Sequence, residues 1–197
     1  LESMALVDRQ FVELKVYAPS PEIRHTYLAM EPLWSDYKSA LIGHTPERSS
    51  TLNLLTLDAQ VLKLAQEGTE QLEQYSGRAV GKLVNLAGRQ RMLSQRTAKF
   101  YLSQNWGAPV PNALMELNKA RTEFVTALQT LMNAPQATEA IQQQLGLAEQ
   151  QWVFFDQALS RLGEGSGGAR RARDVFSTSE QILQIMDKVT GLYSRLT

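Results

Sequence analysis

The segment "VNLAGRQRMLSQR", residues 84–96, combines good helix-forming residues with three arginines and a glycine. At 100° per residue, one side of the helix that it predicts should face the core of its own bundle. That side contains Leu83, Leu86, Leu93, Thr97 and Phe100. The opposite side contains Val84, Gly88, Met92, Gln95 and Leu102. The second side is too apolar for a purely solvated face, which indicates that another helix packs on it.

Gly88 lies at the centre of this second side. A glycine in the middle of a helix costs about 1 kcal/mol relative to alanine, but it also lets another backbone approach closely. A homodimer with a two-fold axis would pair the stripe around Gly88 with itself. We therefore expect this helix to form a seam between two copies of the chain.

The three arginines flank the expected seam. Arg91 lies on one edge, and Arg89 and Arg96 lie one heptad apart on the other edge, where we expect a supporting basic patch. A two-fold axis near Gly88 would bring two Arg91 guanidinium groups together, and buried like charges repel. A small planar anion would relieve this repulsion, because guanidinium is a flat donor fork that suits planar oxyanions.

The local charge of this region agrees with an anion site. The 42 residues between Glu73 and Glu116 contain no acid, so the arginines have no partner on their own helix. The same window contains Arg78, Lys82, Arg89, Arg91, Arg96 and Lys99. The whole chain has a formal net charge of zero, which argues against general nucleic-acid binding.

Composition limits the possible chemistry. The chain has no cysteine and only two histidines, His25 and His44, in unrelated contexts. We find no metal-ligand spacing, no nucleophile with a nearby base and no paired carboxylates in the basic segment. We therefore expect no catalytic residue, no metal and no cofactor, and we expect that the protein is not an enzyme. No apolar run is long enough to cross a bilayer, so any membrane attachment would lie outside this sequence.

Apolar residues recur at helical spacing along nearly the whole chain, which predicts an all-α fold. Turns are expected at 43–48, 106–112, 133–136 and 163–168, where proline or glycine interrupts the pattern. A helix should begin at 19–22 and be kinked or broken near Pro32. Another should begin with Thr45 as N-cap and Pro46 at its first position, then continue to about Asn105. Ser76-Gly77 could interrupt this long helix, which leaves two abutting helices as an alternative.

Two parts of the chain resemble each other. Trp34, Tyr37 and Leu41 match Trp152, Phe155 and Leu159, and residues 60–76 resemble 181–196. We predict a complete antiparallel four-helix bundle at 77–197. We predict that residues 1–76 form three helices of an incomplete, similar bundle that precedes it, with the long helix joining the two. Chance similarity of amphipathic hairpins is the alternative.

The segment "VNLAGRQRMLSQRTAKFYL", residues 84–102, resembles the signature helix of the PilJ-type and NarX/NarQ-like sensor domains. That signature has the form Asn-Leu-Ala-Gly-x-x-Arg-Met-x-Ser-x-Arg. Its positions are occupied here by Asn85, Leu86, Ala87, Gly88, Arg91, Met92, Ser94 and Arg96. The resemblance implies an antiparallel four-helix bundle that dimerises through its first helix, with nitrate or nitrite at the dimer axis.

In that family, a symmetric pair of arginines and the backbone near a glycine hold the anion. Carried over, the arginine is Arg91 and the glycine is Gly88, while Asn85, Met92 and Ser94 would shape the seam. Arg96 matches the signature without an implied direct contact.

The resemblance implies a periplasmic, ligand-sensing domain of a bacterial signal transducer, either a chemoreceptor or a sensor kinase of a two-component system. The alternative is a protein-interaction module of a type IV pilus-linked receptor, in which the signature helix serves only dimer packing.

Overall fold

The computed structural model describes residues 2–43, 45–108, 110–160 and 168–196. These residues form seven helices and no strand, so the predicted all-α fold is confirmed. The chain divides into two compact units, residues 1–77 and 78–197, and each is described by itself. Unit 1 contains α1 (Glu2–Tyr17), α2 (Pro21–Leu41) and α3 (Thr51–Ser76). Unit 2 contains α4 (Ala79–Trp106), α5 (Ala113–Met132), α6 (Glu139–Ser160) and α7 (Gly168–Tyr193).

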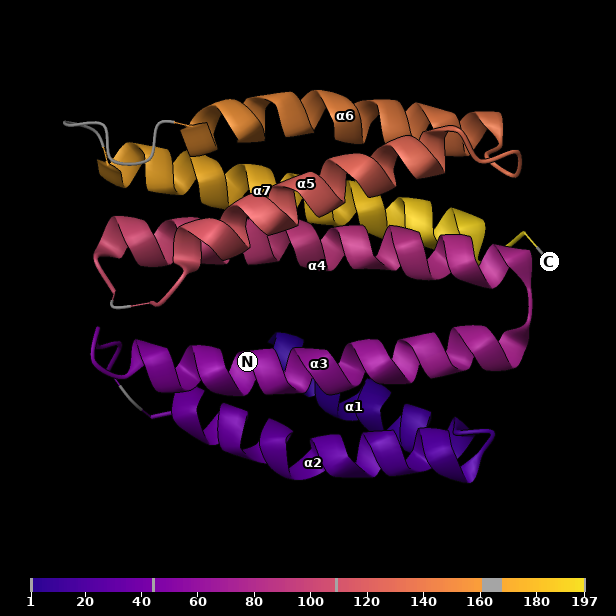
Figure 1. Cartoon of the computed structure of the whole chain (residues 1–197), viewed down its shortest axis with the longest axis horizontal. Helices are drawn as coiled ribbons and strands as arrows, with labels where there is room; N and C mark the ends of the chain where they lie inside the picture. Colours follow the sequence, from indigo (N-terminus) through magenta and orange to yellow (C-terminus); the bar gives the residue numbers. More distant parts are fainter. Residues whose placement is uncertain (1, 44, 109, 161–167, 197) are drawn as a thin grey trace. The chain divides into compact units, whose positions relative to one another are not determined.

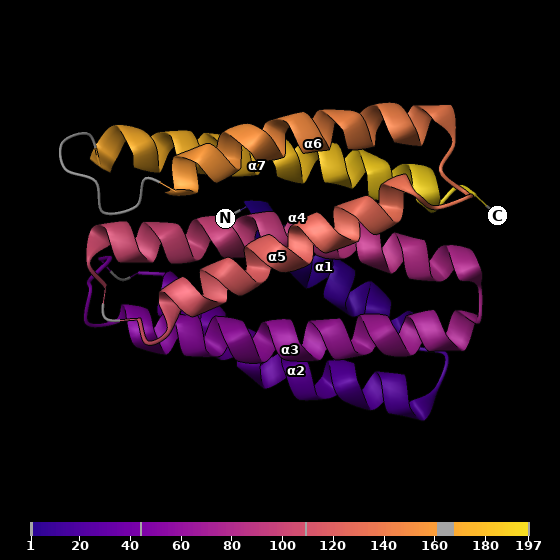
Figure 2. The ribbon, with the colours of Figure 1, turned by 45° about the horizontal axis from the view of Figure 1, so that its top comes forward.

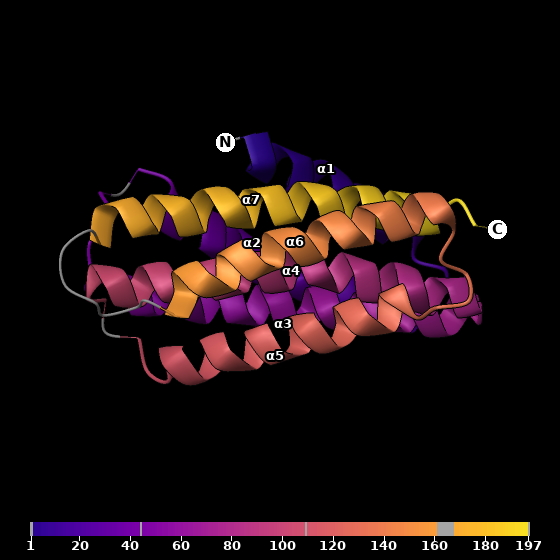
Figure 3. The same cartoon turned by 90° about the horizontal axis from the view of Figure 1, so that it is seen from above.

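Unit 2 is an antiparallel four-helix bundle (Figure 1). Helix α4 packs on both α5 and α7, and α6 closes the bundle by packing mainly on α7. Figure 2 shows α5 crossing α4 obliquely, and Figure 3 shows α6 and α7 side by side along most of their lengths. Because α4 contacts two neighbours, its side chains are divided among a buried face, an α5-facing edge and an α7-facing edge.

The core of unit 2 is continuous and rich in aromatic side chains. Phe124 of α5 stacks on Trp152 of α6 with ring centroids 4.0 Å apart, and Phe155 meets Trp152 edge-on at 5.5 Å. The buried Tyr193 hydroxyl donates a hydrogen bond to the Leu131 carbonyl at 3.0 Å, which joins the end of α7 to α5. These contacts hold α5, α6 and α7 together, and α4 packs against this arrangement.

The long helix that we expected between the two units is interrupted at Gly77, as in the alternative of two abutting helices. Helix α3 ends at Ser76, and Gly77 adopts a left-handed conformation with φ of 61°. Its N–H bonds the carbonyls of Glu73 and Gln74, both at 3.2 Å. Glycine adopts this conformation at little cost, so it ends the helix here, and α4 begins at Ala79.

Other helix boundaries also test the sequence reading. Helix α2 begins as expected, because the Ser20 hydroxyl accepts a hydrogen bond from the Ile23 N–H at 3.2 Å. It continues through Pro32 without a break. The expected start at Thr45 and Pro46 is wrong. Instead, the hydroxyls of Ser50 and Thr51 bond the Glu47 carbonyl, which forms a turn before α3. Of the turn expected at 163–168, residues 163–167 lie outside the described residues, and Gly168 is the first residue of α7.

Unit 1 has a small core in which α2 packs on both α1 and α3. That core consists of Phe11, Ile23, Tyr27 and Met30. The Tyr27 ring lies directly against Gly68 of α3, where an added Cβ would come within 2.7 Å of its Cζ atom. A glycine at this position therefore allows α2 and α3 to approach closely. The similarity of this unit to α5–α7 stays a prediction.

Candidate functional site

Helix α4 brings the two central residues of the predicted site together. The Arg91 guanidinium folds back along the helix, so that its Nη2 atom lies 3.9 Å from where a Cβ would stand on Gly88. Among the described residues, and apart from the backbone of α4 itself, the other atom within 4 Å is Cγ2 of Thr190 on α7, also at 3.9 Å. Both separations are ordinary van der Waals contacts, so an alanine would fit at Gly88 in the single chain. The packing of unit 2 itself therefore does not require this glycine.

Arg91 lies on the α7-facing edge of α4. Its guanidinium donates a hydrogen bond to the Asp187 carboxylate in an ion pair whose side chains are 40% and 65% exposed. On the same edge, the Gln95 amide donates to the Ser179 carbonyl at 3.1 Å. The pair with Asp187 faces solvent, so it contributes little to stability and leaves Arg91 able to exchange partners.

Arg89 and Arg96 lie on the α5-facing edge. Arg89 Nη2 donates to Glu123 Oε2 at 2.9 Å, and Arg96 pairs with Glu116. In both pairs the side chains are half-buried. The absence of acids from their own helix therefore does not leave these two arginines unpaired, because α5 supplies both carboxylates.

The sequence did contain a signal for this pairing. Glu116 and Glu123 are one heptad apart, as are Arg89 and Arg96. In two antiparallel helices, two such pairs can form one above the other. The partners of Arg91 and of the heptad pair come from α7 and α5, so a reading of α4 alone could not identify them.

The other predicted site residues occupy different surroundings. Asn85 and Met92 lie one turn before and after Gly88, and both are half-buried. Met92 also lines a small cavity beside Arg89. Ser94 is fully buried, and its hydroxyl donates to the Arg91 carbonyl of its own helix at 2.9 Å. Ser94 therefore belongs to the interior of the bundle, so the single chain does not present it on the outward side of α4.

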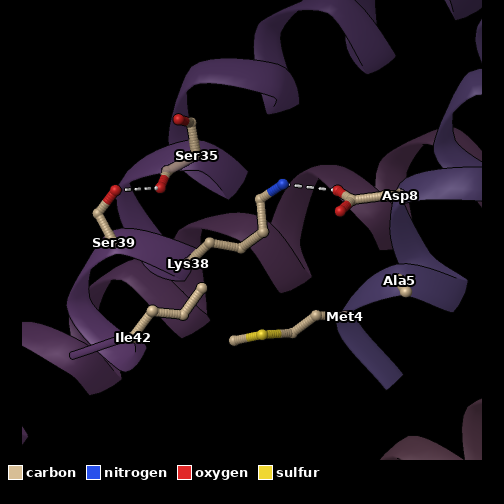
Figure 4. A pocket seen from close by; sticks show the side chains of 7 residues that line it. All are labelled: Met4, Ala5, Asp8, Ser35, Lys38, Ser39 and Ile42. Carbon is tan, nitrogen blue, oxygen red and sulfur yellow. Dashed lines mark hydrogen bonds and ion pairs between the residues drawn. The ribbon is translucent and has the colours of Figure 1, made fainter. Parts of the chain in front are cut away.

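Unit 1 contains an open groove between α1 and α2, shown in Figure 4. It has a volume of about 580 Å³ and is lined by Met4, Ala5, Asp8, Ser35, Lys38, Ser39 and Ile42. Lys38 donates to Asp8 at 2.7 Å, and the Trp34 indole N–H donates to the same oxygen at 2.7 Å. These hydrogen bonds lower the pKa of Asp8. Lys38, the cation among these described lining residues, is thus neutralised, which makes the groove a poor anion site.

Two further findings concern only the residues that the structure describes. No three His, Cys, Asp or Glu side chains among them gather where they could hold a metal ion. In the same residues, no helix has both the length and the apolar character needed to cross a membrane.

Comparison with known proteins identifies one family. The family described as the type IV pili methyl-accepting chemotaxis transducer N-terminal domain, PilJ, matches residues 71–190. The match covers more than half of the chain and includes α4, α5 and α6 completely. No curated protein and no solved structure matches the chain.

Proposed function

The chain belongs to the PilJ family of chemotaxis transducer N-terminal domains, and we propose that it senses a small planar anion such as nitrate or nitrite. The anion would bind at a seam between two copies of the chain, where α4 of each copy contributes Gly88 and Arg91. The observation that carries the proposal is the position of the Arg91 guanidinium beside a glycine that its own bundle does not require.

The geometry of α4 supports a site of this kind. A missing side chain at Gly88 permits close approach of a second helix or of the anion itself. Two Arg91 groups facing each other across a two-fold axis would repel, and one anion between them would satisfy both. The resemblance of residues 84–102 to the nitrate-sensor signature gives the proposed ligand class.

The Asp187 carboxylate would compete with an anion for Arg91. In the single chain, the Asp187 carboxylate takes the place that an anion would occupy on Arg91. Because the pair is exposed, its replacement would cost on the order of 1 kcal/mol or less. Binding would move the two α4 helices relative to each other, to the extent that the anion prefers one arrangement.

The cellular setting is part of the proposal. The domain would lie in the periplasm as the extracytoplasmic part of a signal transducer. Movement of its helices would reach the membrane through segments outside this sequence.

Calorimetric titration with sodium nitrate and sodium nitrite, with protein mass measured in the same solution, tests the proposal. We expect one anion per two chains. Arg91→Gln should weaken binding by about tenfold or more, the effect of losing a charge-assisted hydrogen bond. Arg121→Gln is the matched control, because this substitution also removes an ion pair with a half-exposed carboxylate, that of Asp156. Arg121 lies on α5, so its loss should leave anion binding unchanged.

Gly88→Ala separates the seam from the fold. Because alanine fits here, the free energy of unfolding of the variant should rise by about 1 kcal/mol. The variant should nevertheless lose anion binding. Unchanged affinity in both Arg91→Gln and Gly88→Ala would refute the proposal. A dimer that binds neither anion would instead support the interaction-module alternative.

A further inference from the structure

A second cluster of cations surrounds a small cavity within the single chain. The cavity has a volume of about 140 Å³ and lies between α4 and α5. Its lining consists of Arg89, Met92, Leu93, Arg96, Lys119, Ala120 and Glu123. This volume is enough for several water molecules or for one small ion. Two helices of one chain thus enclose a space lined by three cations and one acid.

The charges of this cavity do not cancel. Glu123 pairs with Arg89, and Glu116 pairs with Arg96 from just outside the lining. Lys119 forms no ion pair with any residue that the structure describes. Counting these five groups leaves one positive charge beside the cavity, so a singly charged anion would neutralise it.

The two arginines retain donors for such an anion. Each guanidinium has five N–H donors, and each donates one hydrogen bond to its carboxylate partner. Arg89 and Arg96 are one heptad apart on the same edge of α4 and are half-buried, so their charges are less screened than those of surface residues. The carboxylate pairs also hold the guanidinium groups in place before a ligand arrives.

We propose that this cavity, henceforth the α4–α5 pocket, binds one small planar oxyanion per chain, of the size of acetate or nitrate. Arg89 and Arg96 would donate to its oxygens, and Lys119 would supply the excess positive charge. The site needs no second copy of the chain. Its charged groups are separate from the arginine of the proposed seam, because Arg91 faces α7 whereas Arg89 and Arg96 face α5, although Met92 belongs to both sites.

The test begins with the Arg91→Gln protein, in which the seam site is removed. Titration with sodium acetate and with sodium nitrate, at constant ionic strength, should reveal one site per chain for at least one of the two anions. Adding Lys119→Gln should weaken this binding by about tenfold. Lys82→Gln is the matched control, because Lys82 is an exposed lysine of α4 that does not line the pocket, and it should leave binding unchanged.

A double variant, Arg96→Gln with Glu116→Gln, removes one ion pair as a unit and leaves no half-buried acid without its partner. It should retain the helical circular dichroism spectrum and also weaken the one-per-chain binding. The proposal is overturned if Arg91→Gln protein binds neither anion, or if Lys119→Gln leaves its binding unchanged. If the binding of one anion per two chains is absent while one anion per chain still binds, only the seam proposal is contradicted. The two proposals can therefore fail separately.

Discussion

The two units differ in how completely their helices enclose a core. In unit 2, α4 packs on α5 and on α7, and fully buried side chains continue along the bundle. In unit 1, α1 and α3 both pack on α2, and the buried apolar cluster consists of four side chains. Among the described residues, the shorter unit 1 exposes nine large apolar side chains and the longer unit 2 exposes eight; those of unit 1 are Leu6, Val12, Val16, Tyr17, Leu28, Leu41, Ile42, Leu52 and Tyr75.

This difference shows how much depends on α4. In unit 2, that helix contributes a buried face to the core, and its two edges carry the ion pairs of the candidate sites. In unit 1, α2 also lies between two neighbours, α1 and α3, but the buried apolar cluster that it helps to form is small. Where α2 meets α3, the Tyr27 ring lies directly against Gly68. The two units should therefore respond differently to equivalent substitutions.

Removal of one core phenylalanine should separate the units most clearly. Phe124 is fully buried and stacked on Trp152, so Phe124→Ala should destabilise unit 2 by about 3–5 kcal/mol. Phe11→Ala in unit 1 should cost less, under about 3 kcal/mol, because a loosely enclosed site collapses more readily around the cavity. Hydrogen exchange measured by mass spectrometry on peptides of α6 and α2 reports the two units separately. Equal losses of exchange protection in the two units would contradict the expected difference between them.

The helical glycines should show the next largest contrast. Gly68→Ala would place a methyl group 2.7 Å from Tyr27 Cζ, and the ring is 2% exposed. The resulting overpacking, about 1–3 kcal/mol, should outweigh the gain in helix propensity of about 1 kcal/mol. Gly146→Ala is the control, because nothing lies within 4 Å of the added methyl, and it should stabilise unit 2. Urea unfolding measures both, and a stabilised Gly68→Ala protein would disprove the tight contact.

Acid should have a smaller effect, which we predict for Asp8 of unit 1. Hydrogen bonds from Lys38 and Trp34 lower the pKa of Asp8 in the folded protein. Their contribution to stability is therefore present above the ordinary carboxyl pKa of about 4 and is lost as the pH falls through the lowered value. Trp34 fluorescence, followed from about pH 5 to pH 2, should change with Asp8 protonation. In Asp8→Asn protein this transition should be absent, and its persistence would assign it to another group.

The bundle could be predicted from sequence because its apolar positions repeat with the helical period. The same period placed Gly88 and Arg91, three residues apart, on neighbouring positions of one helix. The ion pairs with Glu116, Glu123 and Asp187 were missed, because charge was read along one helix and not across two. The α4–α5 pocket was missed for the same reason, since Lys119 comes from the second helix.

Other errors have local causes. Helix propensity alone does not show whether Gly77 will be helical or left-handed, because glycine adopts both conformations readily. Ser94 was assigned to the seam from the family signature, although it lies three residues before Thr97 and directly after Leu93, both on the core side of the helix. Thr45 and Pro46 have the residue types of a helix start, but the hydroxyls of Ser50 and Thr51 hold a turn after them.

The buried polar side chains of α4 have a mechanical consequence. The amide of Gln90 and the hydroxyl of Tyr101 are buried without a hydrogen-bond partner in the described structure. The hydroxyls of Ser94 and Thr97 donate to carbonyls of α4 itself. At these four core positions, no hydrogen bond joins α4 to a neighbouring helix. A translation of α4 along its own axis would therefore break none there, and long side chains at the rim, such as Arg91, could follow it.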